Sequence, residues 1–212
     1  MAHCAHIPAF VLHQVTCQFA TGQTLFGPLS VSLEPSLCGL VGRNGVGKTR
    51  LLRLLAGLDS PAGGHIERAA AVAWVAQQPT LTPETTLATL LGYASVFAAL
   101  SRLEQGQGLA DDFDLLDGHW DLTDRLSLAF READLPPFSA DRPAFSLSGG
   151  ERMKALLCGA FVSGADYLLL DEPTNYLDRQ GREWLYHQLE SWQGGALIQP
   201  RPRAADADAE DY

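Results

Sequence analysis

Basic residues, lysine above all, and long uninterrupted apolar runs are scarce in this sequence. The 15 Lys and Arg residues are outnumbered by 25 Asp and Glu residues, which gives the 212-residue chain a formal net charge of -10. Because a protein that wraps phosphate backbones needs a basic surface, the composition does not favour nucleic-acid wrapping. The apolar stretch 155–170 is broken by Ser163, Gly164 and Asp166, so we expect no membrane segment in this chain, and a membrane role would need a partner.

Cysteine is sparse as well, and no Cys-x-x-Cys pair is present. Since a basic leader followed by an apolar run is also lacking, the pattern predicts a reducing, cytoplasmic environment. His3, Cys4 and His6 form a candidate metal cluster, but without a second half-site at ligand spacing a frayed terminus is the simpler interpretation. The four cysteines are Cys4, Cys17, Cys38 and Cys158.

The hydrophobic pattern predicts an α/β domain with a helical subdomain, and 212 residues suffice for both. Apolar and polar residues alternate over 29–33, which indicates a strand with one exposed face, and together with the preceding segment 10–19 this suggests an antiparallel pair. Leucine spacing indicates a helix over 51–58. We expect the helical subdomain over about 83–163 and interpret its acidic stretch 111–117 as a solvated loop. Further strands are expected at 37–41, 70–75, 167–170 and 196–198, and further helices at 146–162 and 183–192.

The segment 42–49 matches the phosphate-binding pattern GxxxxGK[ST] at every required position. Glycines let backbone N–H groups converge on phosphate oxygens, and the following helix points its positive end at the same anion. In this pattern Lys48 reaches the β- and γ-phosphates, and the Thr49 hydroxyl ligates Mg²⁺. A glycine-rich turn that merely caps a helix is the alternative, but the expected strand and helix on either side favour the phosphate loop. The loop comprises Gly42, Arg43, Asn44, Gly45, Val46, Gly47, Lys48 and Thr49.

An apolar run over 167–170 ends in two acids. We expect Asp171 to hold the Mg²⁺ shell and Glu172 to face the attacking water as its base or orienter. Alone, an apolar strand that ends in two acids is weak evidence for a Mg²⁺ and water site. In a chain that also has a phosphate loop, it is strong evidence for such a site.

Residues 148–151 have the spacing of a capping box, with serine at the cap and glutamate three residues later. The simple interpretation is an ordinary capped helix. The alternative is a third phosphate-binding device, because the N–H groups of the first turn are free to meet an anion. The residues are Ser148, Gly149, Gly150 and Glu151.

In this order the motifs resemble the nucleotide-binding domain of ABC ATPases: Walker A at 42–49, the signature at 147–151 and Walker B at 167–172. The resemblance implies an α/β fold of the P-loop NTPase class and ABC type, with a mixed sheet core, an antiparallel β subdomain and a helical subdomain. It also implies ATP and Mg²⁺ as cofactors. By the same resemblance Gln77 is the Q-loop glutamine, a Mg²⁺ ligand and catalytic residue that links metal and water to the helical subdomain, and Phe19 stacks on adenine.

The segment 171–178, DEPTNYLD, looks like that of the soluble F subfamily, which has two such domains per chain and no membrane part. Residues 118–121 and 184–186 are similar to the N-terminal domain of that subfamily. The similarity covers roughly 9–198, and we expect one nucleotide-binding domain over 1–198.

The resemblance implies a composite site, in which the signature of one domain closes over ATP held by the P-loop of another. Hydrolysis is then expected only with a second nucleotide-binding domain, from a homodimer or a separate chain. The usual partner of the subfamily is the ribosome, although nothing in this sequence indicates an RNA surface. A transporter's ATPase subunit and a catalytically silent ATP-binding remnant are the alternatives, and the Asn175 form of the D-loop speaks against the transporter.

After the strand expected at 196–198, the family pattern calls for Ser-His-Asp-Arg, whose histidine contacts the γ-phosphate. This chain instead reads Gln-Pro-Arg-Pro-Arg over 199–203, and no histidine follows His187. We therefore expect hydrolysis to suffer more than ATP binding, since one such transition-state donor is worth about 3 kcal/mol.

Two interpretations of residues 199–212 stay open. One is a disordered tail rich in Ala and Asp. The other is an out-of-frame tail, because the codons CAG-CCA-CGA-CCG-CGC, read from the second base, spell Ser-His-Asp-Arg. The bases of the gene over codons 198–204 decide between them: if no frame spells that motif, the frameshift hypothesis fails.

Overall fold

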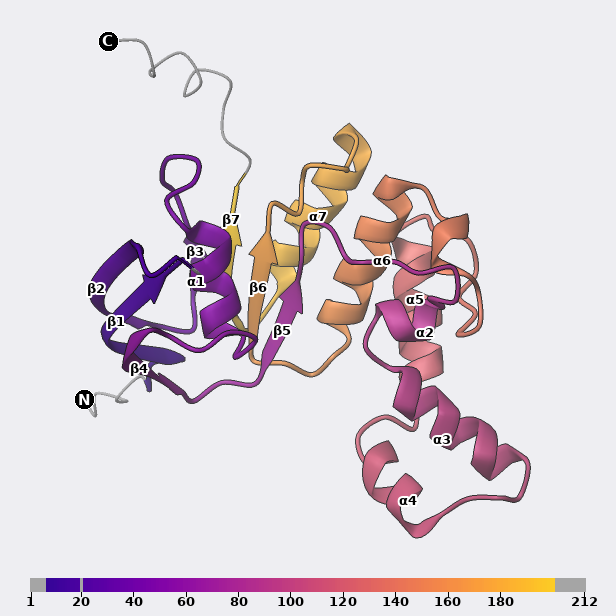
Figure 1. The fold of residues 1–212 in the computed structure, drawn as a ribbon. Coiled ribbons are helices and arrows are strands. Elements are labelled where there is room, and N and C mark those ends of the chain that lie inside the picture. Colours follow the sequence, from indigo (N-terminus) through magenta and orange to yellow (C-terminus); the bar gives the residue numbers. More distant parts are fainter. Residues whose placement is uncertain (1–6, 20, 201–212) are drawn as a thin grey trace, which may run out of the picture. The chain divides into compact units, whose positions relative to one another are not determined.

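The computed structural model describes residues 7–19 and 21–200, and the chain divides into two compact units (Figure 1). The first unit is Met1–Gln77, Gly164–Asn175 and Gln188–Tyr212, and the second is Gln78–Ser163 and Tyr176–His187. The candidate cluster His3, Cys4 and His6 lies outside the described residues, and so does the expected tail from residue 201 onward.

The first unit contains an antiparallel sheet of order β2-β1-β4, drawn in indigo and purple in Figure 1. The pairing of β1 with β2 confirms the antiparallel strands expected from the alternating pattern. The sequence pattern does not predict β4, because Gly63 and Gly64 favour a turn and most side chains of this strand are exposed. The strands are β1 (Phe10–Gln18), β2 (Thr24–Leu33) and β4 (Gly63–Arg68).

A β-bulge interrupts β1 and shifts which residues face the core. Between paired positions, three steps along β1 match two steps along each neighbouring strand. Gln14 stands at φ 49°, and its N–H donates to Ser30 Oγ at 2.9 Å. On β4, Gly64 has φ 77°, and a Cβ there would lie 2.2 Å from the His13 carbonyl oxygen, so glycine is required opposite the bulge. The buried side chains of β1 are Phe10, Leu12, Val15 and Cys17.

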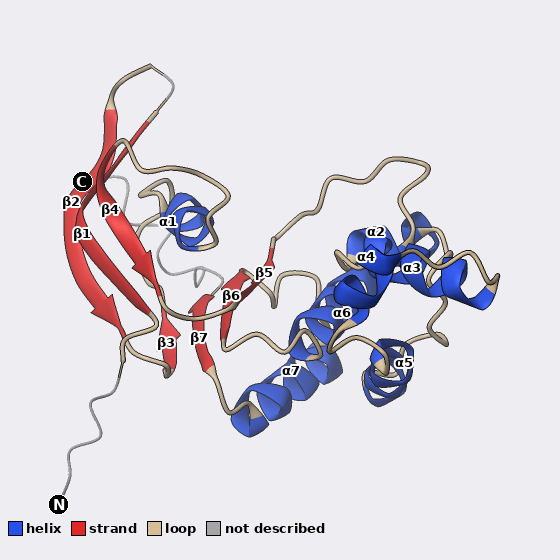
Figure 2. Ribbon diagram, turned by 90° about the horizontal axis from the view of Figure 1, so that it is seen from below, coloured by secondary structure: helices blue, strands red, loops and turns tan. Residues whose placement is uncertain are grey.

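A parallel sheet of order β3-β7-β6-β5 forms the other half of the first unit. Every residue of β6 is buried, as its continuous apolar run predicts. Helix α1 (Lys48–Leu55) packs between the sheets, where Leu52 and Leu55 share one apolar cluster with Phe10 of β1 and Tyr167 of β6 (Figure 2). The strands are β3 (Leu37–Gly39), β5 (Val72–Val75), β6 (Tyr167–Asp171) and β7 (Gly195–Gln199).

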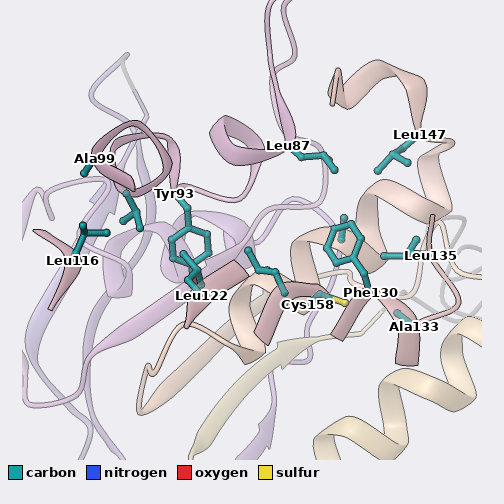
Figure 3. Close-up of a cluster of buried hydrophobic side chains, with 13 residues drawn as sticks. Leu87, Tyr93, Ala99, Leu116, Leu122, Phe130, Ala133, Leu135, Leu147 and Cys158 are labelled. Carbon is teal, nitrogen blue, oxygen red and sulfur yellow. The ribbon is translucent and has the colours of Figure 1, made fainter. Parts of the chain in front are cut away.

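The second unit is helical and has its own apolar core, shown in Figure 3. Leu122, Leu126 and Phe130 recur along one face of α5 and are fully or almost fully buried there. The unit contains the range 83–163 and adds 176–187, which includes the first part of α7 (Arg179–Ser191). Its other helices are α2 (Leu87–Leu90), α3 (Ala94–Glu104), α4 (Ala110–Leu116), α5 (Leu122–Glu132), α6 (Gly149–Phe161) and the 3₁₀ turn Ala144–Ser146.

The acidic stretch 111–117 is a correction to the sequence analysis. It is not a solvated loop, because α4 covers most of it and Asp112 is only 3% exposed. The Asp112 carboxylate accepts hydrogen bonds from Arg102 of α3 and from the backbone N–H of Leu109. A distant partner and a local cap therefore let an acid-rich segment form a helix. Of the helices in the described part of the chain, none combines the length and apolar character needed to cross a membrane.

The final strand also extends further than expected. β7 includes Gln199, one residue beyond the boundary at 198, because Gln199 pairs with Asp171 in the parallel ladder. The Glu172 N–H donates to the Gln199 carbonyl oxygen at 3.0 Å and continues the pairing past β6.

Candidate nucleotide site

The expected phosphate loop joins β3 to α1 in the first unit, as the strand-loop-helix pattern predicts. Gly45 and Gly47 have φ values of 77° and 100°, which suit glycine. Lys48 begins α1, and its Nζ donates to the carbonyl oxygens of Gly42 at 2.7 Å and Arg43 at 2.9 Å. The lysine ammonium is thus held against the loop that the sequence assigned to phosphate.

Gly47 is the most confined glycine of the loop. A Cβ at this position would lie 2.8 Å from Phe26 Cδ1 and 2.9 Å from Leu25 Cδ2, so a larger residue would push against β2. A cavity of about 250 Å³ adjoins the loop here, lined by Phe26, Val46 and Lys48 among others. The other loop residues, Arg43, Asn44 and Val46, are exposed.

Thr49 and Asp171 meet at the start of α1 and the end of β6. Thr49 Oγ1 donates to Asp171 Oδ1 at 3.2 Å, although the residues are 122 positions apart. Asp171 is 2% exposed. Burial raises the pKa of its carboxyl group, the charge of Glu172 adds to that rise, and Thr49 and Lys48 oppose it. The structure therefore brings together two of the three expected Mg²⁺ ligands, Thr49 and Asp171. The third, Gln77, contacts Glu172.

Glu172 is surrounded by side-chain amides. Gln77, which follows β5, donates from Nε2 to Glu172 Oε2 at 2.9 Å, and Gln199 donates from Nε2 to Oε1 at 3.1 Å. Asn175 Nδ2 also donates to Oε2. Glu172 itself has φ 48°, a strained value for this residue type. Gln77 and Glu172, each expected at the site, are in contact with each other, because both follow neighbouring parallel strands, β5 and β6, at the edge where these strands end.

Asn175 and Gln199 contact Glu172 but were not among the residues expected at the site. Asn175 follows Glu172 by three residues in a turn, so proximity in sequence was the available signal. Gln199 had no such signal, because its place depends on the pairing of β7 with β6. Phe19, the expected adenine platform, lies just past β1 with 46% of its surface exposed. Its stacking role stays a proposal.

The signature residues lie in the second unit, at the start of α6. The capping box expected from their spacing is present: the Ser148 N–H donates to Glu151 Oε2 at 2.7 Å, and the Glu151 N–H donates to Ser148 Oγ at 3.2 Å. These bonds lower the pKa of Glu151, the backbone bond most. A Cβ at Gly150 would lie 2.8 Å from the Tyr176 carbonyl oxygen, and one at Gly149 would lie 3.4 Å from the Tyr176 ring. Small residues are therefore needed in this first turn.

The residues of the first unit fit Mg²⁺ and a nucleotide phosphate. A threonine hydroxyl and a buried carboxylate are hard oxygen ligands of the kind Mg²⁺ prefers, and they are already 3.2 Å apart. Left-handed glycines and a lysine at a helix N-terminus suit an anion.

Comparisons with known proteins show the family of this chain. The family model described as ABC transporter matches residues 27–175. The energy-dependent translational throttle protein EttA of Mycobacterium tuberculosis (strain ATCC 25618 / H37Rv) is 33% identical over 91% of this chain and 35% of its own length. The ATP-binding protein Uup of Caulobacter vibrioides is 35% identical over 96% of this chain and 29% of its own length. This chain thus spans about a third of the length of these relatives.

Solved structures share the fold at lower identity. An ATP-binding subunit of an ABC transporter superposes with a TM-score of 0.65 at 21% identity, covering 91% of this chain and 79% of that chain. A second structure, cbiO1 from Clostridium perfringens, part of the ABC transporter complex cbiONQ, gives 0.60 at 18% identity and covers 92% and 79%. The family match over residues 27–175, the phosphate loop and the acid pair after β6 agree, and this chain belongs to the ABC transporter family of ATP-binding domains.

Proposed function

We propose that this chain is the Mg-ATP-binding module of an ABC-F-like ATPase. The contact between Thr49 and Asp171 is the observation that carries this proposal, because it joins the P-loop to the end of β6 as a shared metal site requires. The identity to EttA and Uup favours the F subfamily over other branches, and so does the DEPTNYLD segment at 171–178.

Different residues of the chain bind the phosphates, the adenine, Mg²⁺ and the attacking water. The backbone N–H groups of 42–49 and the Lys48 ammonium bind the phosphates, and Phe19 supports the adenine. Thr49, Gln77 and Asp171 hold Mg²⁺, which when bound neutralises charge on the phosphates. Glu172 accepts a proton from water or orients it, and Gln77 holds the Glu172 carboxylate in place.

Turnover depends on a second nucleotide-binding domain in this proposal. Ser148, Gly149, Gly150 and Glu151 present the N-terminus of α6 for the γ-phosphate of a nucleotide on a partner domain. Each chain has one P-loop and one signature, so a homodimer or a second chain completes two sites. An ATPase subunit of an ABC transporter would share this chemistry and differ in its partner.

A catalytically silent ATP-binding module is the second candidate. Gln199 favours it, because its buried amide donates to Glu172 Oε1, one of the two oxygens that would engage water. Binding without turnover would then be the whole activity of the chain on its own.

A pair of lysine variants tests ATP binding. The chain has only two lysines, and Lys154 lies in the second unit, where its Nζ donates to the Ala133 carbonyl oxygen. We expect Lys48→Met to weaken Mg-ATP binding by about 10- to 100-fold, the value of a charge-assisted hydrogen bond, and Lys154→Met to leave it unchanged. Equal binding by all three proteins would refute the proposal.

Phosphate release then separates the two candidates. We expect ATP turnover per chain to rise with protein concentration, since a second domain is needed. We also expect turnover to vanish in Glu172→Gln, since the carboxylate acts on water. Binding without release at any concentration supports the silent module instead.

The partner and the location are proposed from the relatives alone. The name of EttA describes a translational throttle, so we propose a cytoplasmic partner of the translation machinery, the ribosome. Co-sedimentation of the chain with ribosomes in the presence of ATP tests this partner. Co-purification with a membrane protein would favour the transporter subunit.

A further inference from the structure

We propose that the outer face of the antiparallel sheet binds a transition-metal ion of the zinc type through His13, His65 and Glu67. These side chains lie in the first unit and are separate from the residues of the nucleotide site. Each offers one ligand atom, and the three atoms all lie within 4.8 Å of one another.

The strand register explains why these three side chains meet. His13 of β1 is the direct pairing partner of His65 on β4, so both point to the same face of the sheet. Glu67 follows His65 by two residues and therefore also points to that face. The opposite face of β1 carries Phe10 and Leu12 into the core. The three ligands thus come from the solvent side of two adjacent strands.

The distances between the ligand atoms of these three side chains are close to those around a tetrahedral zinc ion. Four ligands about 2.1 Å from zinc in tetrahedral geometry stand about 3.4 Å apart. His13 Nε2 lies 3.0 Å from Glu67 Oε1, and His65 Nε2 lies 3.7 Å from the same oxygen. Small side-chain movements are enough to fit an ion among these atoms.

The largest side-chain movement that metal binding requires is a rotation of the two imidazole rings. They stack with a centroid distance of 4.3 Å and an interplanar angle of 14°. Because a metal lies in the plane of each imidazole that binds it, the stack opens when the ion enters. The side chains are 44% exposed at His13 and 66% exposed at His65, and histidine χ2 rotates over a broad range, so the rings are free to turn.

The donor set selects the kind of metal. Two imidazoles and one carboxylate are borderline ligands that favour zinc and its neighbours over Mg²⁺ or Ca²⁺. Among the described residues no fourth His, Cys, Asp or Glu joins the group. Water takes the remaining position, as the 63% exposure of Glu67 allows.

The backbone beneath the site is rigidly specified. The bulge next to His13 is fixed by the bond from Gln14 N–H to Ser30 Oγ and by the close approach of Gly64. Because bulges re-aim neighbouring side chains, this local irregularity sets the position of His13 against β4. The ion would cross-link β1 and β4, two strands that are far apart in the sequence.

Zinc titration of the 212-residue chain, without nucleotide, tests the site. We expect one Zn²⁺ per chain and a melting temperature that rises by about 5 °C or more when free zinc is 100 times the dissociation constant. His13→Ala combined with His65→Ala should weaken this binding by at least about 10-fold and remove the thermal shift. Co²⁺ in place of Zn²⁺ should give a visible absorption band that the double variant loses.

Two control variants keep the test specific. The triple variant His3→Ala, Cys4→Ala, His6→Ala removes the N-terminal ligand candidates, and His119→Asn removes a histidine of the second unit. Both should bind zinc like the unmodified chain. The proposal is overturned if the sheet variant keeps the site, if the N-terminal variant loses it, or if the unmodified chain binds no zinc at stoichiometric concentration.

Discussion

Gln199 donates a hydrogen bond from Nε2 to Glu172 Oε1 at 3.1 Å and so links the ends of β7 and β6. Gln199 is 4% exposed, so its amide takes a place on the carboxylate that water would otherwise fill. Gln77 and Asn175 donate to the other carboxylate oxygen. A carboxylate that acts on water needs a free lone pair, and this amide cluster limits the lone pairs that Glu172 can offer.

Gln199→Ala is expected to raise ATP turnover while leaving ATP binding within about twofold, since removing one donor frees Glu172 Oε1 without touching the P-loop. Steady-state phosphate release and nucleotide binding measure the two effects. Gln193→Ala is the matched control, because Gln193 is exposed and donates to the Ser191 carbonyl oxygen, away from Glu172. Unchanged or lower turnover in Gln199→Ala would contradict a restraining role for this residue.

A second prediction concerns two glycines of the P-loop. Gly45 and Gly47 both have positive φ, so alanine costs each about 1 kcal/mol of backbone strain. At Gly47 the new Cβ also meets Leu25 and Phe26, whereas at Gly45 no described residue other than its two chain neighbours lies within 4 Å of the Cβ position. We expect Gly47→Ala to lower the free energy of unfolding more than Gly45→Ala does.

Urea unfolding of the two variants measures this difference directly. A larger loss of stability in Gly45→Ala would show that the packing against β2 is not what confines Gly47. Nucleotide binding by the variants then shows whether the strained loop still accepts phosphate.

The ion pair of the second unit makes stability depend on pH. The Arg102 guanidinium, with help from the Leu109 N–H, lowers the pKa of Asp112 from 3.8 to about 2. Because the folded chain binds this proton less readily than the unfolded chain, the stabilisation is complete above about pH 4 and is lost as pH falls toward 2.

Arg102→Met should therefore lower the free energy of unfolding near neutral pH and reduce its loss between pH 4 and 2. Urea unfolding at several pH values measures both effects. Arg179→Met is the control, since Arg179 and Glu183 form an exposed i,i+4 pair that contributes little. If Arg102→Met keeps the full acid dependence of the unmodified chain, Asp112 is not its source.

Local motifs made most of the nucleotide site predictable from the sequence. The phosphate loop, the strand of Asp171 and the capping box of Ser148 each depend on neighbours within a few residues, so pattern alone finds them. Gln199 could not be found in this way, because its role depends on β7 lying beside β6.

Dependence on residues outside the local sequence also explains why α4 and β4 were not predicted. α4 depends on Arg102, ten residues before Asp112, and an acidic composition hides that partner. β4 begins with two glycines that favour a turn, yet Gly64 is needed beside the bulge of β1. In both places a contact between distant residues outweighs the local preference.

Tyr167 carries the last prediction. Its ring is fully buried and packs edge-on against Phe10 with centroids 5.0 Å apart, but its hydroxyl group has no hydrogen-bond partner among the described residues. An unpaired buried hydroxyl costs about 1–3 kcal/mol. Tyr167→Phe keeps the ring and removes that cost, so we expect the free energy of unfolding to rise by about 1 kcal/mol.

The stability that Tyr167→Phe gains over the unmodified chain should increase at alkaline pH. Burial, with a smaller contribution from Cys38, raises the pKa of Tyr167 from 10.0 to about 12. The unfolded chain then releases this proton at lower pH than the folded chain, so stability falls as pH rises from 10 through about 12, and phenylalanine removes that loss. Tyr186→Phe, at an exposed tyrosine, is the control. A less stable Tyr167→Phe variant would mean that the hydroxyl group has a partner in solution.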